Sequence, residues 1–222
     1  MLFRAILFDL DGTLLDTLED IAQAANDVLA GLDLPTHPPG AYRRFIGDGV
    51  AMLFRRALPP DRVAPGTVDR CVAGFEETYG RSWNVRTRPY DGIPGLLDDL
   101  AARGLGLAVL SNKPDAFTRL CAAEYLARWP FRAVVGQRAG VPRKPDPAGA
   151  LEIAERLGVP VERFLYVGDT AVDMETARRA GMYPVGVAWG FRPIEELRAG
   201  GAAAIIERPA DLLELLETER LG

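Results

Sequence analysis

The apolar residues of this 222-residue chain follow two patterns, continuous runs and runs with helical spacing. The four continuous runs cover residues 5–11, 105–112, 163–169 and 183–190. Each ends in small, polar or acidic residues, and apolar runs of this length are typical of strands that are buried on both faces of a parallel sheet. Weaker runs at 131–136 and 202–206 predict one more strand and an edge strand.

Helical patterns separate the later runs. They cover residues 92–104, 115–129, 146–158 and 173–181. Three of them end at a glycine, Gly104, Gly158 or Gly181, as helices commonly do. This alternation of strands and helices predicts an α/β fold with a doubly wound, Rossmann-like core built on a parallel sheet.

Residues 16–85 interrupt the alternation. This segment has helical spacing and no convincing strand, so we expect an α-helical domain inserted after the first strand. Thr17 and Asp20 have the spacing of a capping box at the start of its first helix. The predicted organisation is a core domain formed by residues 1–15 and 86–222 and a helical domain formed by residues 16–85.

The overall charge and composition exclude several classes of function. The net charge is -5 and the pI is near 5.1, so extended contact with nucleic acid or anionic lipid is not expected. No apolar run approaches the roughly 20 residues that span a bilayer, and the first residues do not resemble a signal peptide, so we expect a cytoplasmic protein. The single histidine, His37, makes a Ser/His/Asp triad or a multi-histidine zinc site hard to build.

The first apolar run ends in two carboxylates, Asp9 and Asp11. Residues i and i+2 of an extended chain point the same way, so both side chains are expected to converge at the carboxyl end of the strand. Two close carboxylates disfavour each other's ionisation unless a cation neutralises them, and a hard divalent ion bound through oxygen would do so. The alternative is that Asp11 and Gly12 only form a turn.

The ends of the other runs carry groups that suit an anionic ligand. Ser111, Asn112 and Lys113 end the second run, ahead of a helix whose N-terminal dipole favours an anion, with the alternative that Ser111 is simply a helix cap. Asp169 ends the third of the four runs, and Asp173 follows on the same helical face, where it would also suit the helix dipole. Ligands of doubly wound sheets bind where such loops meet, beyond the carboxyl ends of the strands.

Lys144 stands between prolines in the segment PRKPDP. Its compact ammonium can lie near several carboxylates or phosphate oxygens where the broad guanidinium of arginine fits less well. Of the 26 lysine and arginine residues, only Lys113 and Lys144 are lysine, and both lie in loops predicted at the carboxyl ends of strands. The candidate residues together predict a Mg²⁺ site with phosphate-binding groups, formed by Asp9, Asp11, Ser111, Lys144 and Asp169.

These residues resemble, in chain order, the motifs of the haloacid dehalogenase superfamily of phosphatases. The first motif is DLDGT at residues 9–13, the second is Ser111, the third is Lys144, and the fourth is GDTAVD at residues 168–173. The helical insert lies where members of this superfamily have a small α-helical cap. Within the superfamily, segments such as FDLDGTLLDT, SNKP and RKPDP look most like those of bacterial phosphoglycolate phosphatases.

The resemblance implies catalytic and metal-binding roles. Asp9 would be the nucleophile that forms an aspartyl-phosphate, and Asp11 would be the general acid and then the general base. Mg²⁺ would be held by the Asp9 carboxylate, the backbone carbonyl of Asp11 and Asp169. Lys144 would neutralise Asp9 and the phosphoryl group, and Asp173 would orient Lys144 or metal-bound water.

It also implies substrate-binding roles. Ser111 and the backbone of Asn112 would bind phosphate oxygens, and Thr13 would shape the phosphate-binding loop behind the nucleophile. Gly47 and Gly49 lie in a segment that resembles the specificity loop of the cap, where glycine lets the backbone approach a ligand closely. A carboxylated substrate would need a nearby cation, for which the candidates, if they are not simply solvated, are Arg43, Arg44, Arg55 and Arg56.

The implied activity is Mg²⁺-dependent hydrolysis of a small phosphorylated metabolite, with 2-phosphoglycolate giving glycolate and phosphate, by a monomer or a homodimer. A phosphatase or phosphomutase of the same scaffold could instead act on sugar phosphates, nucleotides or pyrophosphate. A dehalogenase would need neither the metal nor an acid at Asp11. A phospho-accepting, receiver-type signalling module also joins carboxylates, a hydroxyl and a lysine on a doubly wound sheet, but it needs no cap.

Overall fold

The computed structural model describes residues 2–218. The chain forms two compact units, of which the first comprises Met1–Leu15 and Pro89–Gly222 and the second comprises Asp16–Arg88. The return crossing, predicted between residues 85 and 86, thus lies between Arg88 and Pro89. Two short strands at the crossings, β2 (Leu15–Asp16) and β3 (Arg88–Pro89), form a two-stranded sheet.

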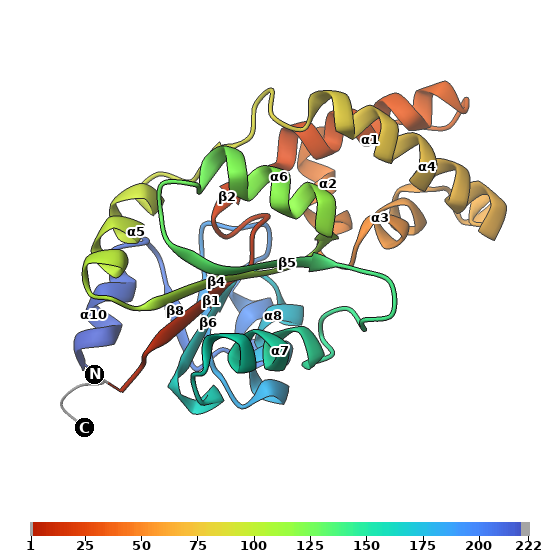
Figure 1. Ribbon diagram of the computed structural model, residues 1–222. Coiled ribbons are helices and arrows are strands. Elements are labelled where there is room, and N and C mark those ends of the chain that lie inside the picture. Colours follow the sequence, from red (N-terminus) through yellow and green to blue (C-terminus); the bar gives the residue numbers. More distant parts are fainter. Residues whose placement is uncertain (1, 219–222) are drawn as a thin grey trace. The chain divides into compact units, whose positions relative to one another are not determined.

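Six parallel strands form the main sheet of the first unit, in the order β5-β4-β1-β6-β7-β8 (Figure 1). They are β1 (Ala5–Phe8), β4 (Gly106–Pro114), β5 (Phe131–Gln137), β6 (Phe164–Gly168), β7 (Tyr183–Val187) and β8 (Ala204–Ile206). The strand order changes direction at β1, because the chain adds β4 and β5 on one side of it and the later strands on the other. The predicted fold class is therefore confirmed.

Helices cover both faces of this sheet. On one face α7 (Ala148–Leu157) and α8 (Ala171–Ala180) pack against the strands, and Leu7, Ile153 and Phe164 belong to a single buried cluster there. The helix α6 (Asp115–Tyr125) lies on the opposite face (Figure 1). The remaining helices of the unit are α5 (Ile93–Ala102), the 3-10 helix η3 (Val161–Arg163), α9 (Ile194–Gly200) and α10 (Asp211–Thr218). The sequence pattern did not predict α9 and α10.

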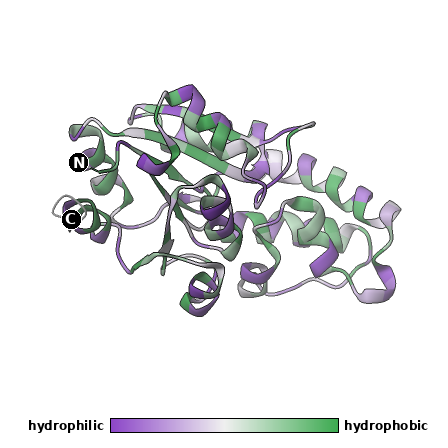
Figure 2. Cartoon of the chain, turned by 90° about the horizontal axis from the view of Figure 1, so that it is seen from below, coloured by the Kyte–Doolittle hydropathy of each residue, from purple (hydrophilic) through white to green (hydrophobic). Residues whose placement is uncertain are grey.

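The second unit is helical. Its elements are α1 (Leu18–Gly31), η1 (Pro39–Ala41), α2 (Tyr42–Phe45), α3 (Val50–Ala57), η2 (Pro60–Arg62) and α4 (Pro65–Ser82). Aromatic rings fill its interior, where Phe75 stacks on Tyr79 and meets Phe54 edge-on. The helices of both units carry hydrophobic as well as hydrophilic residues (Figure 2). Among residues 2–218, no helix combines the length and the apolar character that crossing a membrane requires.

The predicted capping box at the start of α1 is wrong. Thr17 is the N-cap residue, but its side chain makes no capping bond, and its hydroxyl has no hydrogen-bond partner within the described chain. Asp20 is buried and instead accepts hydrogen bonds of 2.8 to 3.0 Å from the backbone N–H groups of Arg86 and Thr87 and from the Thr87 hydroxyl. A partner distant in the sequence has thus replaced the local cap.

Candidate active site

The candidate residues of the first unit follow three neighbouring strands. Asp9 directly follows β1, Ser111 and Asn112 lie in the last part of β4, and Asp169 directly follows β6. Because β4 and β6 flank β1, the change of strand order occurs among these three strands. Open parallel sheets bind ligands at such a point, beyond the carboxyl ends of the strands. The topology therefore brings the candidate side chains to the expected ligand site.

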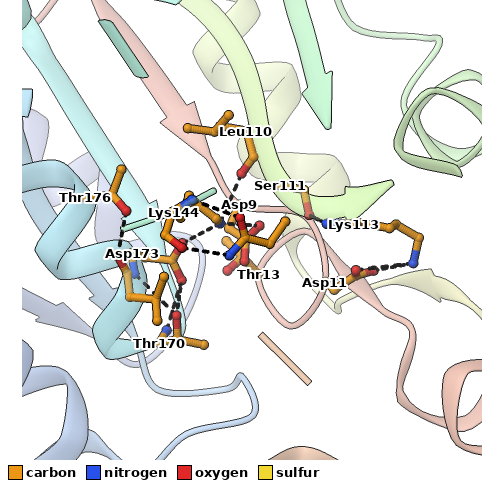
Figure 3. A network of polar contacts seen from close by, with 12 residues as sticks. Asp9, Asp11, Thr13, Leu110, Ser111, Lys113, Lys144, Thr170, Asp173 and Thr176 are labelled. Atoms are coloured by element: carbon orange, nitrogen blue, oxygen red, sulfur yellow. Dashed lines mark hydrogen bonds and ion pairs between the residues drawn. The ribbon is translucent and has the colours of Figure 1, made fainter. Parts of the chain in front are cut away.

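Lys144 lies between two carboxylates in the loop that follows β5. Its Nζ is 2.7 Å from Asp173 Oδ1 and 2.9 Å from Asp9 Oδ1, and it donates a hydrogen bond of 3.2 Å to the Leu110 carbonyl (Figure 3). The side chains of the three charged residues are buried. The contact with Asp9 lacks the geometry of a hydrogen bond, so Asp9 Oδ1 is a buried oxygen that accepts no hydrogen bond from the described residues.

Both oxygens of Asp173 are occupied. Oδ1 accepts from Lys144 and, at 3.4 Å, from the hydroxyl of Tyr166. Oδ2 accepts a hydrogen bond from the backbone N–H of Thr170 at 3.1 Å and another from the Thr170 hydroxyl at 2.6 Å. The Asp173 N–H in turn donates to Thr170 Oγ1, and these reciprocal bonds form a capping box at the start of α8. The same carboxylate therefore begins the helix and anchors the lysine.

Asn112 fixes the backbone of Lys144. Its Nδ2 donates to the Lys144 carbonyl at 3.2 Å, and its Oδ1 accepts from the Lys144 N–H at 3.0 Å. This pair of bonds gives the loop the partner that a neighbouring strand would otherwise supply. Beside it, the Ser111 hydroxyl is buried and accepts from the Lys113 N–H at 3.2 Å.

Asp169 is fully buried, and its position depends on close backbone approach. Oδ2 accepts a 2.8 Å hydrogen bond from the N–H of Phe191, and Oδ1 lies 3.4 Å from the donating hydroxyl of Thr13. Gly12 has a φ of 86°, and a Cβ there would lie 2.3 Å from Asp169 Oδ2. The indole of Trp189 donates to the Thr13 carbonyl at 3.0 Å, which ties the loop after β1 to the segment after β7.

The buried site holds more carboxylates than cationic groups. Burial raises the pKa of Asp9 to about 7, and the Asp173 carboxylate adds to this rise while Lys144 opposes it. Burial also raises the pKa of Asp169 well above its usual value, with Asp173 and Asp9 contributing. Burial alone would lower the pKa of Lys144, but the carboxylates of Asp173 and Asp9 outweigh it and hold that pKa well above its usual range. The ammonium of Lys144 alone does not neutralise this group of carboxylates.

A divalent cation would correct this imbalance. Carboxylate oxygens of Asp9, Asp169 and Asp173 lie within 4.8 Å of one another, and hard cations prefer such oxygen ligands. Asp173 already accepts hydrogen bonds at both oxygens, whereas Asp9 Oδ1 accepts none. Asp9 Oδ1 is therefore the carboxylate oxygen of this group that is most available to a metal ion, since Asp169 also accepts hydrogen bonds at both of its oxygens.

The expected convergence of the Asp9 and Asp11 side chains is wrong. The strand β1 ends at Phe8, so the alternation of an extended chain does not reach these residues. The Asp11 carboxylate points away from Asp9 and pairs with Lys113, whose Nζ lies 3.0 and 3.2 Å from its two oxygens (Figure 3). Each of the two aspartates thus has its own lysine.

The candidate substrate-binding glycines lie in the second unit, between α2 and α3. Gly47 and Gly49 have φ values of 125° and 86°, which favour glycine. Arg56 forms an ion pair with Asp48 and donates to the Phe45 carbonyl at 3.1 Å, so it braces the loop that contains the two glycines.

Several contacts around the site were not predicted. Thr170 and Asp173 have the spacing of a capping box, so this signal was present in the sequence. Tyr166 lies within an apolar run, and nothing in the sequence indicates that its hydroxyl donates to Asp173. The N–H of Phe191 and the indole of Trp189 act through tertiary contacts that residue identity does not reveal.

Comparison with known proteins agrees with this geometry. The family model described as haloacid dehalogenase-like hydrolase matches residues 6–187. The phosphoglycolate phosphatase of Aquifex aeolicus is 34% identical over 214 residues, covering 96% of this chain and 97% of the relative, and that of Nitrosospira multiformis is 34% identical over 219 residues, covering 96% of each. A crystal structure from Lactobacillus delbrueckii subsp. bulgaricus, assigned as a phosphoglycolate phosphatase, matches with a TM-score of 0.90 and 30% identity over 97% of this chain and 98% of that one. The chain therefore belongs to the haloacid dehalogenase-like hydrolase family and is an enzyme.

Proposed function

We propose that the protein is a Mg²⁺-dependent phosphatase that hydrolyses 2-phosphoglycolate to glycolate and phosphate in the cytoplasm, through an aspartyl-phosphate on Asp9. The observation that carries the proposal is the buried group of Asp9, Asp169, Asp173 and Lys144 at the change of strand order. The similarity to phosphoglycolate phosphatases over nearly the whole chain supports the choice of substrate.

In the first half of the reaction, an oxygen of Asp9 attacks phosphorus, and the bond between phosphorus and the ester oxygen breaks. The electron pair of that bond goes to the ester oxygen, which takes a proton from Asp11 and leaves as the alcohol group of glycolate. In the second half, water attacks the phosphorus and gives a proton to Asp11. The bond to Asp9 then breaks, which restores its carboxylate and releases phosphate.

The other site residues position and neutralise the reacting groups. Lys144 is held by Asp173 and by Asn112, so its ammonium is fixed beside the nucleophile before a phosphate arrives. A preorganised charge of this kind stabilises the transition state without a further reorganisation step. We assign the phosphate oxygens to the Ser111 hydroxyl, to the backbone N–H of Asn112 in the last part of β4 and to backbone N–H groups of the loop after β1.

Asp9, Asp169 and the backbone carbonyl of Asp11 would hold Mg²⁺, which when bound supplies positive charge that offsets the repulsion between the carboxylate and the phosphate. The second unit would act as the cap that selects the substrate, with Gly47 and Gly49 in the selecting loop. We place the carboxylate of the substrate with one of the arginines of this unit, Arg43, Arg44, Arg55 or Arg56, of which Arg56 also braces the loop that contains the two glycines.

The test is phosphate release from a substrate panel, with Mg²⁺ or with a chelator present. The panel comprises 2-phosphoglycolate, glucose 6-phosphate, a nucleoside monophosphate and pyrophosphate. We expect Mg²⁺-dependent turnover that is fastest with 2-phosphoglycolate, no activity in Asp9→Asn, and normal activity in the control Asp99→Asn, which changes an exposed aspartate on α5. Isomerisation of a sugar phosphate would indicate a mutase, and stable phosphorylation without turnover would indicate a receiver module. Full activity in Asp9→Asn would exclude Asp9 as the nucleophile.

A further inference from the structure

The ion pair between Lys113 and Asp11 has a geometry that fixes the orientation of a carboxylate. The Lys113 Nζ lies 3.0 Å from Asp11 Oδ1 and 3.2 Å from Oδ2, so the ammonium bridges both oxygens (Figure 3). The side chains retain only 5% and 11% exposure, respectively, so water does little to screen the pair. A bridged carboxylate cannot turn about its last bond without losing one of the two contacts.

The backbone at both ends of the pair is also fixed. The Lys113 N–H donates to the Ser111 hydroxyl at 3.2 Å, and the Lys113 carbonyl accepts from the fully buried Thr118 hydroxyl at 3.1 Å. At the other end, Asp11 forms an isolated bridge with Leu15, whose carbonyl accepts the Gly12 N–H at 2.9 Å. Since neither backbone segment is loose, the ion pair decides where the Asp11 carboxylate lies.

We infer that Lys113 is a positioning residue for Asp11, which it holds at the edge of the site in the orientation needed to give a proton to the leaving group and to take one from the attacking water. The inference rests on the proposed phosphatase function. Lys113 acts through Asp11 and is distinct from Lys144, whose Nζ contacts Asp9 and Asp173 on the other side of the nucleophile. A misplacement of about 1 Å at a reacting group can slow a reaction on the order of a hundredfold, so loss of this support is measurable.

Two aryl phosphate esters that differ in the basicity of the leaving group separate this role from the alternatives. The leaving group of p-nitrophenyl phosphate is stable without a proton, whereas the more basic leaving group of phenyl phosphate benefits from a proton donor. We expect Lys113→Met to lower kcat/KM for phenyl phosphate by about tenfold or more, and that for p-nitrophenyl phosphate by about twofold or less. Asp11→Asn should show the same order of effects. The control Arg119→Met, which removes an exposed ion pair with Asp115 on the neighbouring helix, should change neither value.

A double-mutant cycle completes the test. If Lys113 acts through Asp11, Lys113→Met causes no further loss in an Asp11→Asn background, because the carboxylate that it positions is already gone. Equal losses with both esters would instead indicate that Lys113 binds the phosphate or only supports the fold, and additive losses in the cycle would mean that it acts independently of Asp11. Either outcome overturns the inference. A wild-type protein that hydrolyses no phosphate ester would refute the proposed function itself, and the inference with it.

Discussion

Replacement of Asp9 by asparagine is expected to stabilise the metal-free protein above neutral pH, although it removes the proposed nucleophile. Asp9 shares the ammonium of Lys144 with Asp173, and its carboxylate lies within 4.8 Å of Asp169 as well. Asparagine has nearly the same volume and carries no charge. Lys144 would keep its bonds to Asp173 and to the Leu110 carbonyl, so the variant relieves crowding of negative charge without leaving a buried ammonium unpaired.

The size of the effect follows from the pKa of Asp9. A carboxyl group whose pKa is higher in the folded state stabilises the fold at low pH, and this contribution is lost as the pH rises from the unfolded to the folded pKa. For Asp9 the pKa rises from 3.8 to about 7, so the loss occurs between these two values. At about 1.4 kcal/mol per pKa unit, the wild type loses about 4 kcal/mol in all, of which about 2–3 kcal/mol falls between about pH 5 and pH 8. A difference of that size corresponds to about 5–10 °C in the unfolding midpoint of a chain of this length.

The assay is thermal unfolding followed by tryptophan fluorescence, in a chelator and at both pH values. Between low and high pH, the midpoint of Asp9→Asn should fall less than that of the wild type, and at the higher pH the variant should be the more stable protein. Asp99→Asn serves as the control because it removes an exposed carboxylate outside the site. Addition of Mg²⁺ should then raise the wild-type midpoint more than that of Asp9→Asn. Equal pH dependence in the wild type and Asp9→Asn would refute this account of the site.

Three further substitutions test the supports of the site and of the second unit. Asn112→Ala removes both hydrogen bonds that hold the Lys144 backbone, so we expect kcat for phosphate release to fall about 10- to 100-fold. The circular dichroism spectrum should stay unchanged, and an unaltered kcat would exclude the positioning role of Asn112. Gly190→Ala would place a Cβ 2.2 Å from Asp169 Cβ, and we expect Mg²⁺ binding, followed by the thermal midpoint during a Mg²⁺ titration, to weaken at least about tenfold. Asp20→Ala leaves three donors without their acceptor, so urea unfolding should show a loss of about 3 kcal/mol, and a loss below about 1 kcal/mol would contradict the assigned contacts.

The parts of the fold that the sequence predicted depend on local patterns. The four residues of β1 are all buried, and a strand buried on both faces needs an unbroken apolar run, so its pattern was unambiguous. The short helix α9 was missed because its seven residues carry too little periodicity for a pattern. The convergence of Asp9 with Asp11 was wrong for a different reason, since the period of two applies only while the chain stays extended. The partners of Asp20 lie 66 and 67 residues away, which no local pattern can show.

The use of lysine rather than arginine at two positions has a structural reason. The Lys144 ammonium faces Asp9, Asp173 and the Leu110 carbonyl, which belong to separate elements and approach it from different sides. A tetrahedral ammonium has three donors that can serve separate acceptors, whereas the planar guanidinium directs its donors along one fork. At Lys113 a point charge bridges the two oxygens of one carboxylate within a space that leaves its side chain only 5% exposed. Each of the two lysines therefore holds a carboxylate within a buried space that suits a compact cation.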